Sequence, residues 1–130
     1  MRARRKERCY MDKERNKSTF GDFIKKKRKE KGITLRCLAS KMGISLTYLH
    51  DVETSRRIPP IRHLYEMAQN LCTSEEEKYQ LYDLAAAARC EAPVDLVPYI
   101  MEHDALRMVL RKARDLHLGE EFWLEIVNFM

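Results

Sequence analysis

The residues with the most evident binding chemistry lie in one short stretch, GISLTYLHDVETSRR, at residues 43–57. Leu49 and Val52 are three residues apart, so on a helix they share an apolar face. The opposite face carries one apolar residue together with hydrogen-bond donors and acceptors: Leu46, Thr47, His50 and Asp51. Arg56 and Arg57 follow, and guanidinium groups bind anionic oxygens. This pattern predicts recognition by hydrogen bonding beside an anion-binding loop.

Catalytic and metal-binding patterns are missing from the sequence. It has no glycine-rich phosphate loop, no HExxH motif, no nucleophile elbow and no convincing carboxylate pair. Its acidic runs, SEEE and GEE, fall at predicted helix starts, where they favour the helix dipole. The four cysteines show no CxxC pairing and no histidine at ligand spacing: Cys9, Cys37, Cys72 and Cys90. We therefore expect no enzymatic activity, no metal and no cofactor, and reduced thiols in a cytoplasmic protein.

The elements that must position the binding residues are predicted to be helices. Four of them start at a Ser or Thr that can cap the first turn: Thr19, Thr34, Ser45 and Ser74. Ser74 and Glu77 have the spacing of a capping box. Another helix is predicted at about residues 61–71, with four apolar residues offered to the core: Ile61, Leu64, Ala68 and Leu71. No segment alternates like a strand, so we expect an all-α fold.

Two of these short helices are joined through Gly43-Ile44-Ser45 and share one apolar patch. Gly43 allows the chain to turn with positive φ, and Ala39 must be small because the next helix crosses over it. The outer face of that next helix is left exposed. A helix of this width fits the major groove of duplex DNA, so the geometry predicts a helix-turn-helix whose second helix reads base edges.

Residues 19–72 resemble the phage-repressor (Xre/Cro-type) helix-turn-helix family, with FGDFIKKKRKEKGITLRCLASKMGISLTYLHDVETSRRIPP matching its pattern nearly end to end. Seven residues fall in register with that pattern: Arg28, Gly32, Ala39, Gly43, Leu49, Val52 and Glu53. The resemblance implies a compact five-helix bundle whose third helix reads DNA. It also implies a structural ion pair between Arg28 and Glu53. The residues that would face base edges are those of the exposed face: Leu46, Thr47, His50 and Asp51.

The resemblance further implies phosphate contacts at the start of the second helix and in the loop after the third. The candidates are Thr34, Arg36, Ser45, Arg56 and Arg57. Two positions depart from the family pattern. Leu35 stands where the family often has a phosphate-clamping Gln, so Thr34, Arg36 or the backbone amides must supply that contact. Ser55 stands where the family favours Gly, and serine can adopt that turn at modest cost.

The net charge of +5 is unevenly distributed along the 130 residues. Residues 1–31 carry 14 Lys/Arg against 5 Asp/Glu, whereas residues 73–130 carry 6 against 12. The basic front half suggests a polyanionic partner. We predict a disordered basic arm over residues 1–18, a DNA-binding domain over 19–90 and a C-terminal helical segment over 91–130. The arm is equally compatible with phosphate contact and with a solvated tail.

The C-terminal segment carries an apolar helical stripe that is too extensive to sit in water, and it packs either on the preceding helices or on another copy. Its predicted dimer or partner contacts are Leu106, Val109, Leu110, Phe122, Trp123 and Ile126. The predicted function is a sequence-specific transcriptional regulator, a repressor that binds a palindromic operator in double-stranded DNA as a homodimer. The alternative is an antitoxin that binds a toxin through this segment and autoregulates its operon. No apolar run is long enough to cross a bilayer, so no membrane contact is expected.

Overall fold

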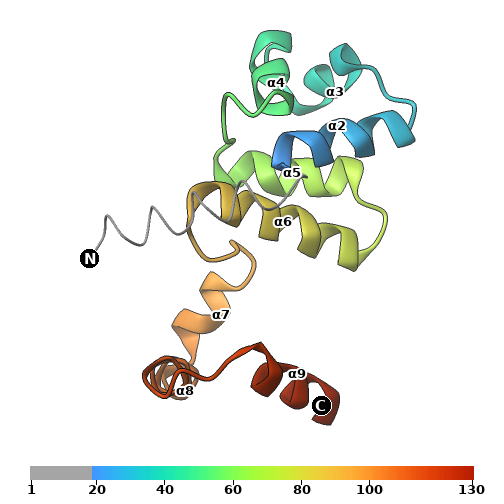
Figure 1. Cartoon of the computed structure of the whole chain (residues 1–130). Helices are drawn as coiled ribbons and strands as arrows, with labels where there is room; N and C mark the ends of the chain where they lie inside the picture. Colours follow the sequence, from blue (N-terminus) through green and yellow to red (C-terminus); the bar gives the residue numbers. More distant parts are fainter. Residues whose placement is uncertain (1–18) are drawn as a thin grey trace. The chain divides into compact units, whose positions relative to one another are not determined.

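The structure is a computed structural model that describes residues 19–130 (Figure 1). The basic arm predicted over residues 1–18 lies outside the described residues. All regular secondary structure within residues 19–130 is helical, which confirms the all-α fold class. The chain divides into two compact units, and the boundary between them in the sequence falls between Val94 and Asp95.

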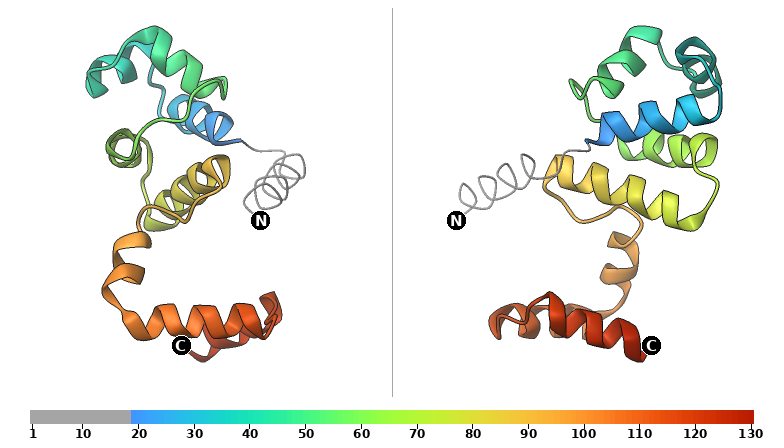
Figure 2. Two further views of the ribbon diagram at one scale, coloured as in Figure 1. Left: turned by 90° about the vertical axis from the view of Figure 1, so that its left-hand side faces the viewer. Right: turned by 45° about the vertical axis from the view of Figure 1, so that its right-hand side comes forward.

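The described part of the first unit contains five helices: α2 (Phe20–Glu30), α3 (Leu35–Met42), α4 (Leu46–Glu53), α5 (Ile61–Leu71) and α6 (Glu75–Arg89). Helices α2, α5 and α6 contact one another and lie side by side (Figure 2). Helix α4 packs on α2 and α3, and α3 also contacts α5. The second unit contains α7 (Val97–Glu102), α8 (Asp104–Asp115) and α9 (Glu120–Phe129).

The predicted caps of the first unit are confirmed. The Thr19 hydroxyl accepts from the Asp22 amide at 3.2 Å, and the Asp22 carboxylate accepts from the Thr19 amide at 3.3 Å, so α2 begins with a complete capping box. The hydroxyls of Thr34, Ser45 and Ser74 accept from the amides three residues on in the same way. The capping box predicted at Ser74 is only half formed, because the carboxylate three residues later accepts from Thr73 instead.

The three turns between α2 and α5 each contain a residue with left-handed backbone. Gly32 follows α2 with φ of 66°, and Gly43 ends α3 with φ of 64°. Ser55 follows α4 with φ of 63°, where the family pattern favours glycine. The expectation that serine would adopt this conformation is confirmed, and it carries the penalty of a side chain in the left-handed region.

The core of the first unit lies between the five helices. Its largest fully buried aliphatic side chains are Ile24, Leu38, Leu49, Leu64, Met67, Leu71 and Leu81. The prediction that Ile61 faces this core is wrong, because its side chain is 49% exposed. Ile61 is the first residue of α5, and Pro59, just before the helix, is buried in its place.

The second unit has little interior of its own. Ala113 on α8 is the one buried residue among its described positions. Arg107 donates to the carbonyl of Ile100 at 2.8 Å and also pairs with Asp104, so its guanidinium holds the end of α7 against α8. Among the described residues, no helix is long and apolar enough to span a bilayer.

Candidate nucleic-acid interface

The inner face of α4 fixes this helix to the first unit. Leu49 and Val52 are fully buried in the common core, as predicted. Gly21, in the first turn of α2, lies against the last turn of α4, where a Cβ atom would stand only 2.5 Å from the carbonyl oxygen of Glu53. The Ser55 hydroxyl also donates to the Thr19 hydroxyl at 3.1 Å. Only glycine at position 21 therefore allows α2 and α4 to approach this closely.

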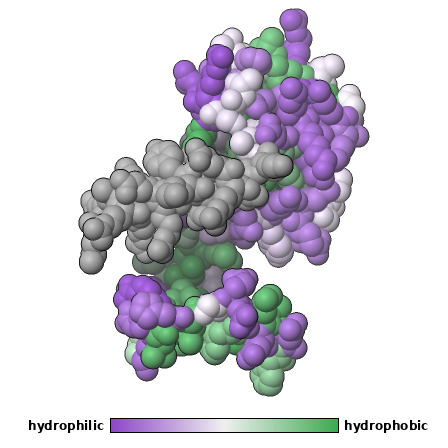
Figure 3. All heavy atoms as spheres, in the orientation of Figure 1, coloured by the Kyte–Doolittle hydropathy of each residue, from purple (hydrophilic) through white to green (hydrophobic). Residues whose placement is uncertain are grey.

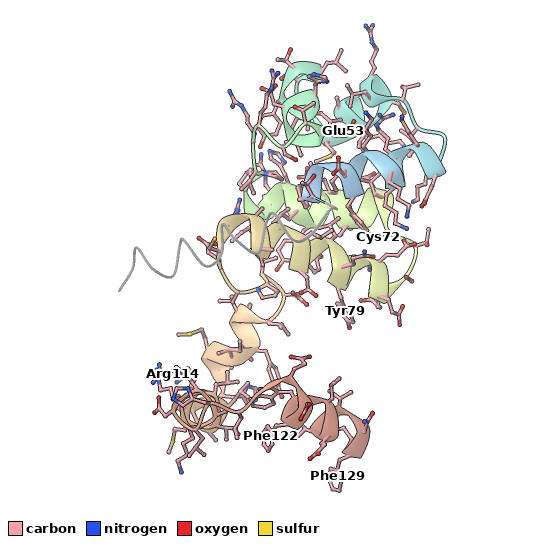
Figure 4. The ribbon with its side chains drawn as sticks, in the orientation of Figure 1. Glu53, Cys72, Tyr79, Arg114, Phe122 and Phe129 are labelled. Atoms are coloured by element: carbon pink, nitrogen blue, oxygen red, sulfur yellow. The ribbon has the colours of Figure 1, made fainter. Side chains whose placement is uncertain are left out.

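An ion pair between α2 and α4 lies beneath the exposed face. Arg28 Nε donates to Glu53 Oε1 at 2.6 Å, and Nη2 donates to Oε2 at 3.2 Å. Arg28 Nη1 also donates to the carbonyl of Ile33 at 2.9 Å, so one guanidinium joins α2, α4 and the turn before α3. The side chains are 12% and 5% exposed, and Glu53 points into the bundle (Figure 4). The two parallel hydrogen bonds fix the angle of α4.

The outer face of α4 is exposed, in keeping with its predicted role. Leu46, Thr47 and His50 are all exposed, and Leu46 and Thr47 lie in the first turn of the helix. Helix-turn-helix proteins read base edges mainly with the N-terminal residues of the reading helix. The surface of the first unit seen in Figure 3 is largely hydrophilic.

Asp51 differs from the other three candidates for base contact. Its side chain is only 20% exposed, and its Oδ2 lies 3.4 Å from Arg57 Nε. The Arg57 guanidinium also lies 5.7 Å from the centre of the Tyr48 ring, within the range of a cation–π interaction. Asp51 and Tyr48 together hold Arg57 beside the reading helix. The backbone of this loop is fixed as well, because the Arg56 and Arg57 amides donate to the Asp51 carbonyl at 2.8 and 3.2 Å.

The candidates for phosphate contact lie at the starts of α3 and α4 and in the loop after α4. Thr34 and Ser45 are the caps of α3 and α4, and their hydroxyl oxygens accept from backbone amides at 3.1 Å. A hydroxyl that accepts in this way keeps its own O–H to donate to a phosphate oxygen. Arg36, in the first turn of α3, and Arg56, in the loop after α4, are exposed. The first amides of a helix lack intrahelical partners, so the start of α3 suits an anion.

Sequence reasoning missed the contacts that brace α2 from the other side. Lys27 Nζ donates to Glu77 Oε1 at 2.7 Å, across fifty residues of sequence, and also approaches Glu30 at 3.2 Å. The hydrogen bond from Lys27 and that from the Thr73 amide lower the pKa of Glu77 to about 2. The same hydrogen bond raises the pKa of Lys27. The lysine run of α2 gave no sign that one of its members pairs with α6.

His63 is a second buried group that the sequence did not reveal. Its side chain is 11% exposed, its Nδ1 lies 3.3 Å from a Glu66 carboxylate oxygen, and its ring stacks at a tilt on Tyr48 with centroids 5.9 Å apart. This contact supports the aromatic ring that carries Arg57. Across residues 19–130, no cluster of three His, Cys, Asp or Glu side chains could hold a metal ion.

Comparisons with known proteins agree with this geometry. A family model described as helix-turn-helix matches residues 24–78. An uncharacterized HTH-type transcriptional regulator, y4dJ of Sinorhizobium fredii, is 39% identical over 57 residues, which are 44% of this chain and 74% of that protein. The ImmF control region 10 kDa protein of Bacillus phage phi105 is 42% identical over 49 residues, 38% of this chain and 54% of that protein. No solved structure matches the chain significantly.

Proposed function

The chain belongs to the phage-repressor (Xre/Cro-type) helix-turn-helix family and is a DNA-binding transcriptional regulator, and we propose that it is a repressor that binds a palindromic operator as a homodimer. The observation that carries this proposal is the exposed outer face of α4, which stands on a rigid support and is bordered by arginines. The simplest mechanism is occlusion, in which the bound protein blocks access to a promoter.

Base recognition is assigned to the exposed face of α4. Thr47 and His50 offer hydrogen-bonding groups to base edges, and Leu46 offers an apolar contact to a thymine methyl group. Asp51 can accept from a cytosine amino group, although it would then have to leave Arg57. Each good base contact discriminates by about 1–3 kcal/mol, so one α4 helix reads only a short half-site.

Phosphate contact is assigned to the residues around α4. Thr34 and Ser45 would donate their hydroxyls, and Arg36, Arg56 and Arg57 would neutralise phosphate charges. Two such units on a palindrome would place their α4 helices one duplex turn apart, about 34 Å. The C-terminal helices are the proposed dimer surface, because their apolar residues are exposed: Val109, Leu110, Phe122 and Ile126, with Leu106 and Trp123 half-buried.

The direct test is selection of a binding site from random duplex DNA, followed by footprinting. We expect an enriched palindrome with half-sites one turn apart. The double variant Thr47→Ala/His50→Ala should relax the preference within the half-site. Arg56→Ala should weaken binding to all sequences and make binding less dependent on salt. A matched control is Gln80→Ala, an exposed change on α6 that should leave binding unchanged. Failure to enrich any sequence would refute the proposal.

The dimer is tested by light scattering on the full chain and on a shortened chain that ends at Ala92. A dimer that becomes a monomer on shortening supports the C-terminal helices as the interface. A monomer in both forms would contradict the homodimer. It would favour the second candidate function, an antitoxin whose exposed apolar C-terminal helices bind a foreign protein.

A further inference from the structure

Helix α9 is apolar around most of its circumference, yet none of its residues is buried. Phe122 and Phe129 project from the same side of the helix (Figure 4), and Phe129 is 92% exposed. Trp123 is the one residue of α9 that is half-buried, with its ring 5.1 Å from that of Phe122. A helix that is apolar all round is normally covered by other protein. The second unit does not supply this cover.

Helix α8 has an uncovered apolar stripe of its own. Ala113 is buried within the second unit, but Val109 and Leu110 on the same side of the helix are exposed. Figure 3 shows hydrophobic residues at the surface of this unit beside hydrophilic ones. The two helices therefore expose apolar surface in the manner of an interface rather than of a solvated domain.

Helices α8 and α9 carry charges of opposite sign, and several of these charges form no ion pair with the described residues. On α8, Arg107 pairs with Asp104 and Arg114 with Asp115. This leaves two cations of α8 without an ion pair in the described residues: Arg111 and Lys112. Helix α9 carries no cation, and three of its carboxylates form no ion pair in the described residues: Glu120, Glu121 and Glu125. Helical spacing places Lys112 next to Val109, whereas Arg111 lies on the face opposite Ala113. The second unit thus carries a basic helix and an acidic helix, with Lys112 and Glu125 beside exposed apolar residues.

We propose that α8 and α9 of one copy pack on α9 and α8 of a second copy, in a two-fold symmetric dimer with reciprocal charge pairing. This inference rests on the proposed homodimer and specifies its interface. In a two-fold interface the same patch serves both copies, so each basic helix can meet an acidic one. A foreign partner of uniform charge would match one helix and repel the other. The opposite signs on one unit therefore favour a second copy of this chain as the partner.

A charge-swap experiment on the full chain tests this interface. One variant, Glu121→Arg/Glu125→Arg, makes α9 basic, since these residues are four apart and lie on one face. The other, Lys112→Glu, reverses the cation that flanks the apolar stripe of α8. Each variant alone would set like charges against each other at both contacts, and we expect its homodimer to be at least tenfold weaker. An equimolar mixture restores opposite charges at both contacts, so it should form a dimer with one copy of each variant.

Light scattering gives the mass, which should double from 15.5 kDa on dimerisation, and native mass spectrometry identifies the mixed dimer. Lys25→Glu, at an exposed position of α2, makes the same charge change as Lys112→Glu elsewhere and should leave the dimer intact. Should a reversal lower the helical content seen by circular dichroism, Glu121→Gln/Glu125→Gln replaces it, with an expected weakening of about threefold. Homodimers of wild-type strength in either variant, or a mixture that stays monomeric, would overturn the interface.

The outcome is independent of DNA binding. A successful charge swap in a chain that selects no DNA sequence would leave the interface standing and refute the repressor. Binding to a palindrome by charge variants that keep the wild-type mass would leave the repressor standing and place its dimer contact elsewhere.

Discussion

Gly21→Ala isolates the contact that sets the position of α4. The added Cβ would lie 2.5 Å from the carbonyl oxygen of Glu53, 2.6 Å from that of Val52 and 2.8 Å from the hydroxyl of Ser55. A carbon normally approaches a carbonyl oxygen no closer than about 3.3 Å. Two of the three obstacles are backbone atoms, so relief requires a movement of α2 away from α4.

The magnitude follows from two opposing effects. Overpacking of this kind destabilises by about 1–3 kcal/mol, and rigid backbone neighbours favour the upper part of that range. Because alanine has a higher helix propensity than glycine, the substitution also stabilises the helix by at most about 1 kcal/mol. We therefore expect Gly21→Ala to lower the free energy of unfolding by about 2 kcal/mol, which for a unit of this size lowers the melting temperature by about 8–16 °C.

The assay is thermal and urea unfolding followed by far-UV circular dichroism. Lys25→Ala, an exposed change on the same helix, serves as the control and should leave stability within about 0.5 kcal/mol of the wild type. A Gly21→Ala protein as stable as the wild type would show that α2 and α4 separate freely, and the account of Gly21 as the residue that admits this approach would be wrong.

Further predictions concern the ion pairs and the surface of the first unit. Glu53→Ala leaves Arg28 buried without its carboxylate and should destabilise by about 3–5 kcal/mol in urea unfolding; a loss below 1 kcal/mol would contradict this. The hydrogen bonds from Lys27 and from the Thr73 amide together lower the pKa of Glu77 from 4.5 to about 2, so the stabilisation by this carboxylate is complete above pH 4.5 and is lost as the pH falls towards 2. The gap in melting temperature between wild type and Glu77→Gln should therefore close over that range, and a gap that is constant with pH would refute the pairing. Ile61→Gln should change stability by less than about 0.5 kcal/mol, because the side chain is exposed; a large loss in thermal unfolding would restore Ile61 to the core.

Local signals in the sequence predicted the helices of the first unit well. A capping hydroxyl acts on an amide three residues away, so Thr34 and Ser45 could be identified from spacing alone. Gly43 could be placed in a left-handed turn because glycine there ends one apolar pattern before another begins. Ser55 required the family resemblance, since serine has no intrinsic preference for positive φ.

Contacts between segments that are far apart in the chain could not be predicted from the sequence. Gly21 lies inside a helix and has ordinary helical backbone. A glycine is required there only because carbonyl oxygens of α4 lie against it, which the sequence does not reveal. Lys27 looks like any member of a solvated lysine run until α6 brings Glu77 within 2.7 Å. Ile61 follows the same spacing as the buried residues of α5, but the pattern does not tell where the core ends along the helix.

In the candidate interface, too, the sequence predicted the helix and its exposed face but not the contacts of single side chains. Helical spacing puts His50 and Asp51 on one outer face and predicts the same role, base contact, for both. The structure separates them, since His50 is exposed, whereas Asp51 faces Arg57, whose guanidinium also rests on Tyr48. A carboxylate next to phosphates is tolerable when an arginine neutralises it, and the same arginine becomes better ordered for phosphate contact. We therefore expect Asp51 to act on DNA chiefly through the position of Arg57, so that Asp51→Ala should weaken binding to every sequence more than it changes the preferred base.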